Sequence, residues 1–182
     1  MRFKSGIQRT LFLMLVFSLA VMIFCFFLRN IGFFESLGIT ALAVFTHAVI
    51  RYAGSVIVSV LPKRFTDPSR KCYQPKKWEP ALYKKLGFKR LKNRAPTYDP
   101  DEFDFKKRTP RELLENSCRA EAIHKIIALM SFLPALYSLK FGALPVFLTT
   151  SALGAAVDLY FVAVQRYNRP RLIKYASLHE NK

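Results

Sequence analysis

Glycine, cysteine and acidic residues are all scarce in this chain. The seven glycines are scattered and form no glycine-rich phosphate loop, which argues against a nucleotide-hydrolysing enzyme. The three cysteines are an odd number without metal-type spacing, so neither a disulfide framework nor a zinc site is indicated. With only 12 Asp plus Glu against 29 Lys plus Arg, the formal net charge is +17.

A charge of +17 in 182 residues would by itself suggest a nucleic-acid-binding protein. The distribution of residues argues against that class, because the basic residues lie between long apolar blocks and the aromatic residues lie largely in or beside those blocks. Aromatic residues placed in this way do not form a surface for stacking bases. We therefore expect no nucleic-acid partner, and the hydrophobic share of 52% points to a membrane protein instead.

Four apolar blocks come close to the length of about 20 residues that a helix needs to cross a bilayer. They cover about 11–28, 37–61, 122–139 and 141–164. The third is short, so a re-entrant or buried helix is its alternative. The first follows basic residues, as in a signal peptide, but it is long and no small-x-small cleavage site follows, so we expect a retained span. The predicted fold class is an all-α integral membrane protein with about four transmembrane or membrane-embedded helices, forming a single membrane domain over 1–182.

The basic residues predict the orientation of this protein in the membrane. Residues 63–111 hold sixteen Lys plus Arg against six Asp plus Glu, and both ends of the chain are basic too. The links between the first two blocks and between the last two carry one basic residue each. The positive-inside rule therefore places both termini and the loop of about 62–121 in the cytoplasm, in a multi-pass protein of the cell (inner) membrane. Anionic membrane lipid is an expected partner of the basic loop.

The middle segment contains seven prolines between 62 and 110, which exclude one continuous helix. Its residues 78–86, WEPALYKKL, predict a short amphipathic helix with Trp78 and Tyr83 at the membrane interface. The stretch TPRE at 109–112 then combines an N-cap Thr, a Pro at the first helical position and a Glu at the third. We expect a helix to start there and to continue into the third apolar block.

Glu121 and His124 are candidate catalytic residues at the start of that block. Residues three apart share one face of a helix, so the carboxylate is placed to orient the imidazole. A histidine oriented in this way acts as a general base toward a hydroxyl. The alternative is an ordinary interfacial histidine beside a surface ion pair, because such spacings are common on helices.

Asp158 is an acid inside the fourth block, and it should therefore face the other helices. Because the third and fourth spans are antiparallel, Glu121 and His124 are expected to meet Asp158 and the following segment, QRYNRPRL at 165–172, on one side of the membrane. Two readings are open for His47 and Arg51 in the second block. They form a functional intramembrane pair, or the span ends near Arg51 and the remainder lies along the interface.

Several motifs of this chain resemble the glycosyl-4,4'-diaponeurosporenoate acyltransferase family, small membrane enzymes that complete staphyloxanthin-type carotenoids. The similar segments are RAExIH at 119–124 and QRYNRPRL at 165–172, preceded by LP at 61–62, FxDP at 65–68, WE at 78–79, LY at 82–83, LG at 86–87 and Lys92. The resemblance covers about 61–172. Where the family tends to read Asn-x-Pro, this chain has Asp158-Leu159-Tyr160.

The resemblance implies transfer of a fatty acyl group to a hydroxyl of a (glycosylated) isoprenoid or another lipid acceptor. It makes His124 the general base and Glu121 its orienter. No bound cofactor is expected, and acyl-CoA or acyl carrier protein would be the co-substrate. Planar guanidinium groups bind oxyanions well. The predicted substrate-binding residues are Arg119, Asp158, Gln165, Arg166, Asn168, Arg169, Arg171, Trp78 and Tyr83.

Two alternatives stay open at this stage. One is a metal-dependent lipid-modifying enzyme built on Glu121, His124 and Asp158, although the sequence has no HExxH pattern and no metal ligand is predicted. The other is a non-catalytic lipid-binding subunit of a biosynthetic complex, which the short chain and basic loop would permit. The sequence predicts no oligomeric state.

Overall fold

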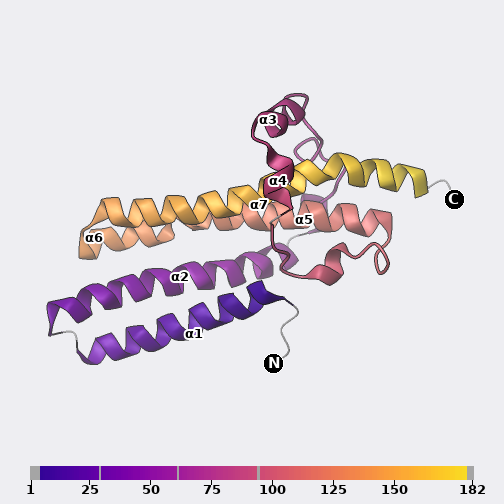
Figure 1. The fold of residues 1–182 in the computed structure, drawn as a ribbon. Helices are drawn as coiled ribbons and strands as arrows, with labels where there is room; N and C mark the ends of the chain where they lie inside the picture. The colour runs from indigo at the N-terminus through magenta and orange to yellow at the C-terminus, as the bar shows by residue number, and fades with distance from the viewer. Residues whose placement is uncertain (1–4, 29, 61, 94, 180–182) are drawn as a thin grey trace.

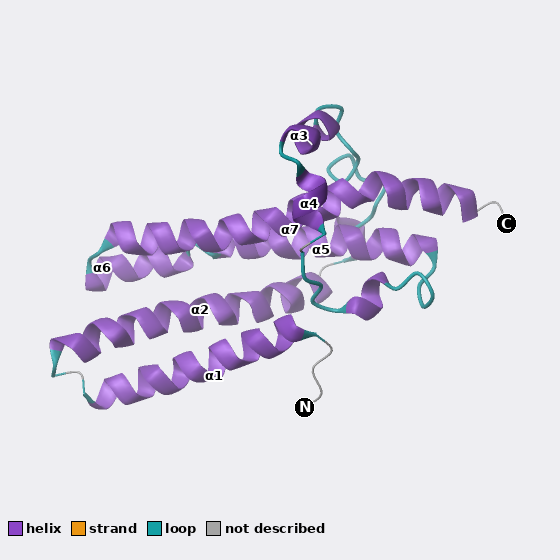
Figure 2. Cartoon of the chain, in the orientation of Figure 1, coloured by secondary structure: helices purple, strands orange, loops and turns teal. Residues whose placement is uncertain are grey.

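The structure, a computed structural model, describes residues 5–28, 30–60, 62–93 and 95–179. Leu61, where the second span was expected to end, lies outside the described residues. Helices make up most of the described chain, and no strand occurs in it (Figure 2). The prediction of an all-α protein is therefore confirmed.

Four segments are long and apolar enough to cross a membrane: 6–27, 32–58, 110–141 and 144–179. The elements in chain order are α1 (Gly6–Phe27), α2 (Gly32–Val60), η1 (Lys63–Phe65), α3 (Glu79–Lys85), α4 (Phe88–Lys92), η2 (Pro100–Phe103), α5 (Pro110–Met130), η3 (Leu133–Tyr137), α6 (Ser138–Phe141) and α7 (Leu144–His179). The prediction of four spanning helices and of short elements in the proline-rich segment is confirmed.

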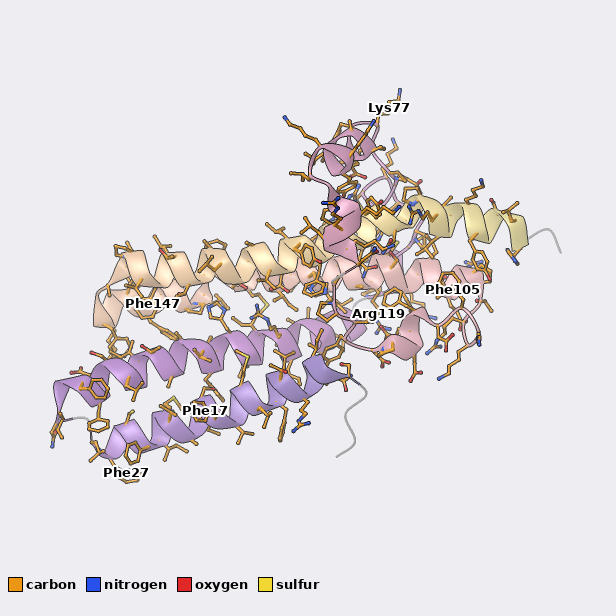
Figure 3. The ribbon with its side chains drawn as sticks, in the orientation of Figure 1. Phe17, Phe27, Lys77, Phe105, Arg119 and Phe147 are labelled. Carbon is orange, nitrogen blue, oxygen red and sulfur yellow. The ribbon has the colours of Figure 1, made fainter. Side chains whose placement is uncertain are left out.

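The long helices form two antiparallel pairs, α1 with α2 and α5 with α7, and α2 packs against α5 (Figure 1). Four passes return the chain to its starting side, so α1 begins at the same end of the bundle where α7 ends and where α3, α4 and η2 lie (Figure 1). Large apolar side chains are exposed along the helices, with Phe17 at 72% and Phe27 at 77% (Figure 3). Such exposure suits contact with lipid rather than water.

α5 begins where the sequence predicted. The Thr109 hydroxyl accepts from the backbone N–H of Glu112, while the Glu112 carboxylate accepts from the N–H of Thr109, which completes a capping box. The helix ends earlier than the third apolar block, at Met130. The chain then turns through η3, whose first turn contains Pro134, and through α6. The third block is thus a helix followed by a break.

α7 is longer than the expected span of 141–164. Its 36 residues extend about 54 Å at 1.5 Å per residue, against a hydrocarbon core of about 30 Å. The helix continues through the whole segment 165–172, with Pro170 inside it. The arginine-rich motif is therefore a helical extension beyond the apolar stretch, and α3 and α4 lie against it (Figure 1).

α2 also continues past the point where one interpretation ended it. The helix passes Arg51 without a break and ends at Val60. Its approach to α5 depends on Gly54, where an added Cβ would lie 2.4 Å from Cγ1 of Ile127. Near this close contact, Arg51 of α2 forms an ion pair with Asp158 of α7.

Candidate active site

His124 lies on α5 and faces α7. Its Nδ1 is 2.9 Å from Oδ1 of Asp158. Its ring stacks on Phe161, with centroids 4.8 Å apart and an interplanar angle of 14°. The side chain stays 24% exposed, and no described residue hydrogen-bonds its Nε2. A neutral imidazole that donates from Nδ1 in this way leaves the Nε2 lone pair available to accept a proton.

The Asp158 carboxylate is buried and is shared between two partners. Its Oδ1 faces His124, while its Oδ2 is 3.2 Å from Nη2 of Arg51 on α2. Arg51 also donates to the backbone carbonyl of His47, 3.1 Å away. A carboxylate among apolar helices needs such partners because burying an unpaired charge costs several kcal/mol. The expectation that Asp158 faces the other helices is confirmed, and Arg51 faces the bundle as well.

The expected pairing of Glu121 with His124 is wrong. Glu121 is fully buried, and its carboxylate accepts from Lys125, Arg166 and Arg169 instead. The reason is the position of α7, which brings two guanidinium groups to Glu121 and a second carboxylate to His124. The partner that fixes the imidazole therefore comes from a different helix.

We call Glu79, Glu121, Arg166 and Arg169 the arginine clamp. Arg166 is 2.7 Å (Nε) from Oε1 of Glu79 and 2.9 Å (Nη1) from Oε1 of Glu121. It also donates to the carbonyls of Cys72 and Gln74. Arg169, fully buried, donates to Glu121, to the carbonyl of Tyr73 and to Ser117. The clamp fastens α3 and the segment before it to α5 and α7.

Because they belong to the arginine clamp, Arg166 and Arg169 have few free donors for binding a substrate. Both were predicted to bind substrate, yet the structure uses their donors for carboxylates and carbonyls of the protein itself. Charge-assisted bonds of this kind fix geometry because the guanidinium fork is planar. These two arginines hold α3, α5 and α7 together.

The side chains of the other predicted residues of the motif form no hydrogen bond or ion pair with the described residues. Gln165 and Asn168 are half-buried, and no described residue hydrogen-bonds to their side chains. Arg171 is exposed, with its Cζ 5.4 Å from the ring centroid of Tyr167. On α5, Arg119 is half-buried and lies about 200° around the helix from Glu121, since each residue turns the helix by about 100°. Figure 3 marks its place beside α5.

Trp78 and Tyr83 lie at α3, as the amphipathic pattern predicted. Trp78 is 57% exposed, and Nζ of Lys76 lies 5.8 Å from its ring centroid. The Tyr83 ring contacts Phe88 and Tyr167, with centroids 5.1 and 5.5 Å away. Burial raises the pKa of Tyr83 above its ordinary value, so its hydroxyl stays neutral. Tyr83 belongs to a groove between α3, α4 and α7, whereas Trp78 is open to the surroundings.

A further polar residue lies one turn from Arg51. Both ring nitrogens of His47 are buried and have no hydrogen-bond partner among the described residues, and the same holds for the hydroxyl of Ser151 on α7. An added Cβ at Gly154 would lie 3.3 Å from Cε1 of His47. The glycine therefore gives the imidazole its space beside α7.

Glu121, His124 and Asp158 do not form a common set of metal ligands. Glu121 is held in the arginine clamp, whereas the other two pair with each other. Among the described residues, no group of three or more His, Cys, Asp or Glu side chains is placed to hold a metal ion.

Sequence reasoning missed two members of these clusters. Phe161 is three residues after Asp158 and therefore shares its face of the helix. This spacing was a signal that an aromatic ring would lie beside the partner of Asp158. Glu79 was noted only as part of a motif, yet it is one of only six acidic residues among sixteen basic ones in the segment 63–111. An acid in such surroundings is a signal of a specific ion pair.

Four helices long and apolar enough to cross a membrane, with a histidine paired to a buried carboxylate, define an integral membrane protein with a candidate acid–base site. The sequence model of the glycosyl-4,4'-diaponeurosporenoate acyltransferase family matches residues 69–177, more than half of the chain, and the chain belongs to this family. It is accordingly an acyltransferase of carotenoid biosynthesis. α1 and α2, with Arg51, lie outside the matched region. No curated protein and no solved structure matches the chain.

Proposed function

We propose that this enzyme transfers a fatty acyl group to a hydroxyl of a glycosylated isoprenoid or a similar lipid acceptor, with His124 as the general base and Asp158 as its orienting partner. The observation that carries the proposal is the bond of 2.9 Å between Nδ1 of His124 and the buried Asp158 carboxylate, with Nε2 unpaired. This is the arrangement that a histidine base needs. Glu121 has no part in the chemical step.

The step begins when Nε2 of His124 removes the proton of the acceptor hydroxyl. The oxygen then attacks the carbonyl carbon of an acyl thioester, and a tetrahedral intermediate forms. When the carbon–sulfur bond breaks, the sulfur takes the proton from Nε2, so the products are an ester and a free thiol. Asp158 stabilises the imidazolium that exists between these two proton transfers.

In this proposal the thioester enters from the end of the bundle that carries the termini and the basic segment. The charge asymmetry of the chain supports a cytoplasmic position for that end, in the cell (inner) membrane. In this orientation a water-soluble thioester, on coenzyme A or on acyl carrier protein, reaches His124 from the cytoplasm. The lipid acceptor reaches it from the bilayer, along the exposed apolar faces of the helices.

The test is comparative lipid analysis of carotenoid-producing cells that express the wild type, His124→Gln and His179→Gln at matched levels. His179 is an exposed histidine at the end of α7, so its variant is the control for the same chemical change. We expect an acylated lipid, identified by its mass increase, with the wild type and the control only. Unchanged product with folded His124→Gln would refute the base role.

A further inference from the structure

A basic groove lies between the short helices of the middle segment and the extension of α7. Its volume is about 680 Å³, and α3, α4 and α7 all contribute to its walls. The aromatic part of the wall consists of Tyr83, Phe88 and Tyr167, whose ring centroids are 5.1 to 5.5 Å apart. The cationic part consists of Lys84, Lys89, Arg90, Arg166 and Arg171.

Most of these cations have no acidic partner. The one carboxylate in the wall, Glu79, is buried and forms an ion pair with Arg166, so these two charges cancel each other. No described acid forms an ion pair with Lys84, Lys89, Arg90 or Arg171. The groove therefore has a surplus of positive charge beside an apolar surface.

Lys92, at the end of α4, lies beside this wall, and it converges with Arg171 on the ring of Tyr167. Nζ of Lys92 lies 5.8 Å from the centroid of Tyr167, and Cζ of Arg171 lies 5.4 Å from it. Burial lowers the pKa of Lys92, and the charges of Arg171 and Lys89 lower it further. Like charges held together in this way are favoured when an anion lies between them.

The groove is connected to the candidate base by a row of aromatic rings. Phe88 contacts Tyr160, whose ring contacts Phe161, which in turn stacks on His124; the centroid distances are 6.1, 5.4 and 4.8 Å. The hydroxyl of Tyr160 also donates to the carbonyl of Leu91, 2.7 Å away, which fastens α4 to α7. Tyr160 and Phe161 are consecutive residues of α7, about 100° apart around the helix, so this row of rings passes around α7 from the groove to the imidazole.

We propose that this groove binds the phosphate of the acyl donor, a phosphopantetheine thioester, through Arg171 in its wall and Lys92 beside it. Coenzyme A and acyl carrier protein both present this phosphate next to a chain of amides that ends in the sulfur. The phosphate lies between the two cations, and the pantetheine arm runs along the aromatic wall toward His124. This assignment rests on the proposed function, because it supplies the thioester that the base would use.

The test measures binding rather than turnover, so that its failure is separate from failure of the catalytic proposal. Phosphopantetheine and pantetheine, which differ by one phosphate, are titrated calorimetrically into the full chain in a non-ionic detergent. We expect the wild type to bind phosphopantetheine at least about tenfold more tightly, as one charge-assisted contact provides. Lys92→Gln/Arg171→Gln should bind the two compounds equally.

The matched control is Lys71→Gln/Lys77→Gln, which removes two exposed charges of the same segment that neither line the groove nor lie over the ring of Tyr167. It should keep the preference of the wild type. Equal binding of both compounds by the wild type, or a preference that survives in Lys92→Gln/Arg171→Gln, would overturn the assignment. Displacement of phosphopantetheine by an equimolar amount of phosphatidylglycerol would assign the groove to a lipid headgroup instead, which also overturns it.

Discussion

His124 on α5 and Asp158 on α7 are joined by a hydrogen bond of 2.9 Å, although 34 positions separate them in the chain. The bond exists because α5 and α7 are antiparallel neighbours whose facing surfaces place the two residues opposite one another (Figure 1). Asp158 is fixed in turn by Arg51 from a third helix. The candidate base is therefore oriented by the packing of three helices.

Replacing the carboxylate of Asp158 by an amide tests this relationship. Asp158→Asn should lower kcat by about 10²- to 10⁴-fold, because the amide no longer stabilises the imidazolium. KM should change little, since substrate contacts are kept. Steady-state kinetics on purified protein measure both constants, with Asp104→Asn, at a half-buried acid in the loop after η2, as the control. A KM effect without a kcat effect would contradict the orienting role.

Glu121→Gln should act on stability rather than on the chemical step. The substitution leaves Arg166 and Arg169 with an uncharged partner in a buried position, which costs about 3–5 kcal/mol in comparable ion pairs. Thermal unfolding in detergent micelles should show a large decrease in midpoint. Glu115→Gln, which breaks an exposed pair on the same helix, should cost less than about 1 kcal/mol. Normal stability combined with a lost kcat would instead support the orienting role expected from the sequence.

Gly54→Ala should loosen the contact between α2 and α5. An alanine normally stabilises a helix interior relative to glycine by about 0.5–1 kcal/mol. Here its Cβ would lie 2.4 Å from Cγ1 of the buried Ile127, and such overpacking costs about 1–3 kcal/mol. The unfolding midpoint should fall, whereas Gly32→Ala, with nothing within 4 Å of the added Cβ, should leave it nearly unchanged. An increase for Gly54→Ala would contradict the close packing.

Tyr73 should give the protein a specific sensitivity to alkaline pH. Its hydroxyl donates to the carbonyl of Phe65, 2.8 Å away, and burial raises its pKa to about 12. In the unfolded chain the phenol has a pKa of about 10. The folded state therefore holds the proton more tightly, and the stability that this provides is complete below pH 10 and is lost as the pH rises toward 12.

The measurement for Tyr73 is the unfolding midpoint of the wild type and of Tyr73→Phe between pH 9 and pH 12. The advantage of the wild type should be constant up to about pH 10 and should then decrease. A difference between the two proteins that does not depend on pH would show that the phenol does not titrate in this range.

The sequence alone determined much of the fold. Blocks of about 20 apolar residues can satisfy their backbone groups in a bilayer only as helices, so composition and length fixed the class and the number of spans. The start of α5 was predicted to the residue because Thr109, Pro110 and Glu112 form a local capping signal. The end of α5 at Met130 was not predicted, since the turn after it depends on contacts with α7 as well as on Pro134.

The partners of the polar residues were decided only by the tertiary structure. His124, Asp158 and most of the arginine motif were recognisable from the sequence because charged residues at the edge of an apolar span are rare and costly. Their spacing on one helix favoured Glu121 as the partner of His124. The packing of α7 against α5 instead pairs Glu121 with Arg166 and Arg169, and it pairs His124 with Asp158. A buried charge pairs with the nearest opposite charge in space. The order of residues along one helix does not specify which charge that is.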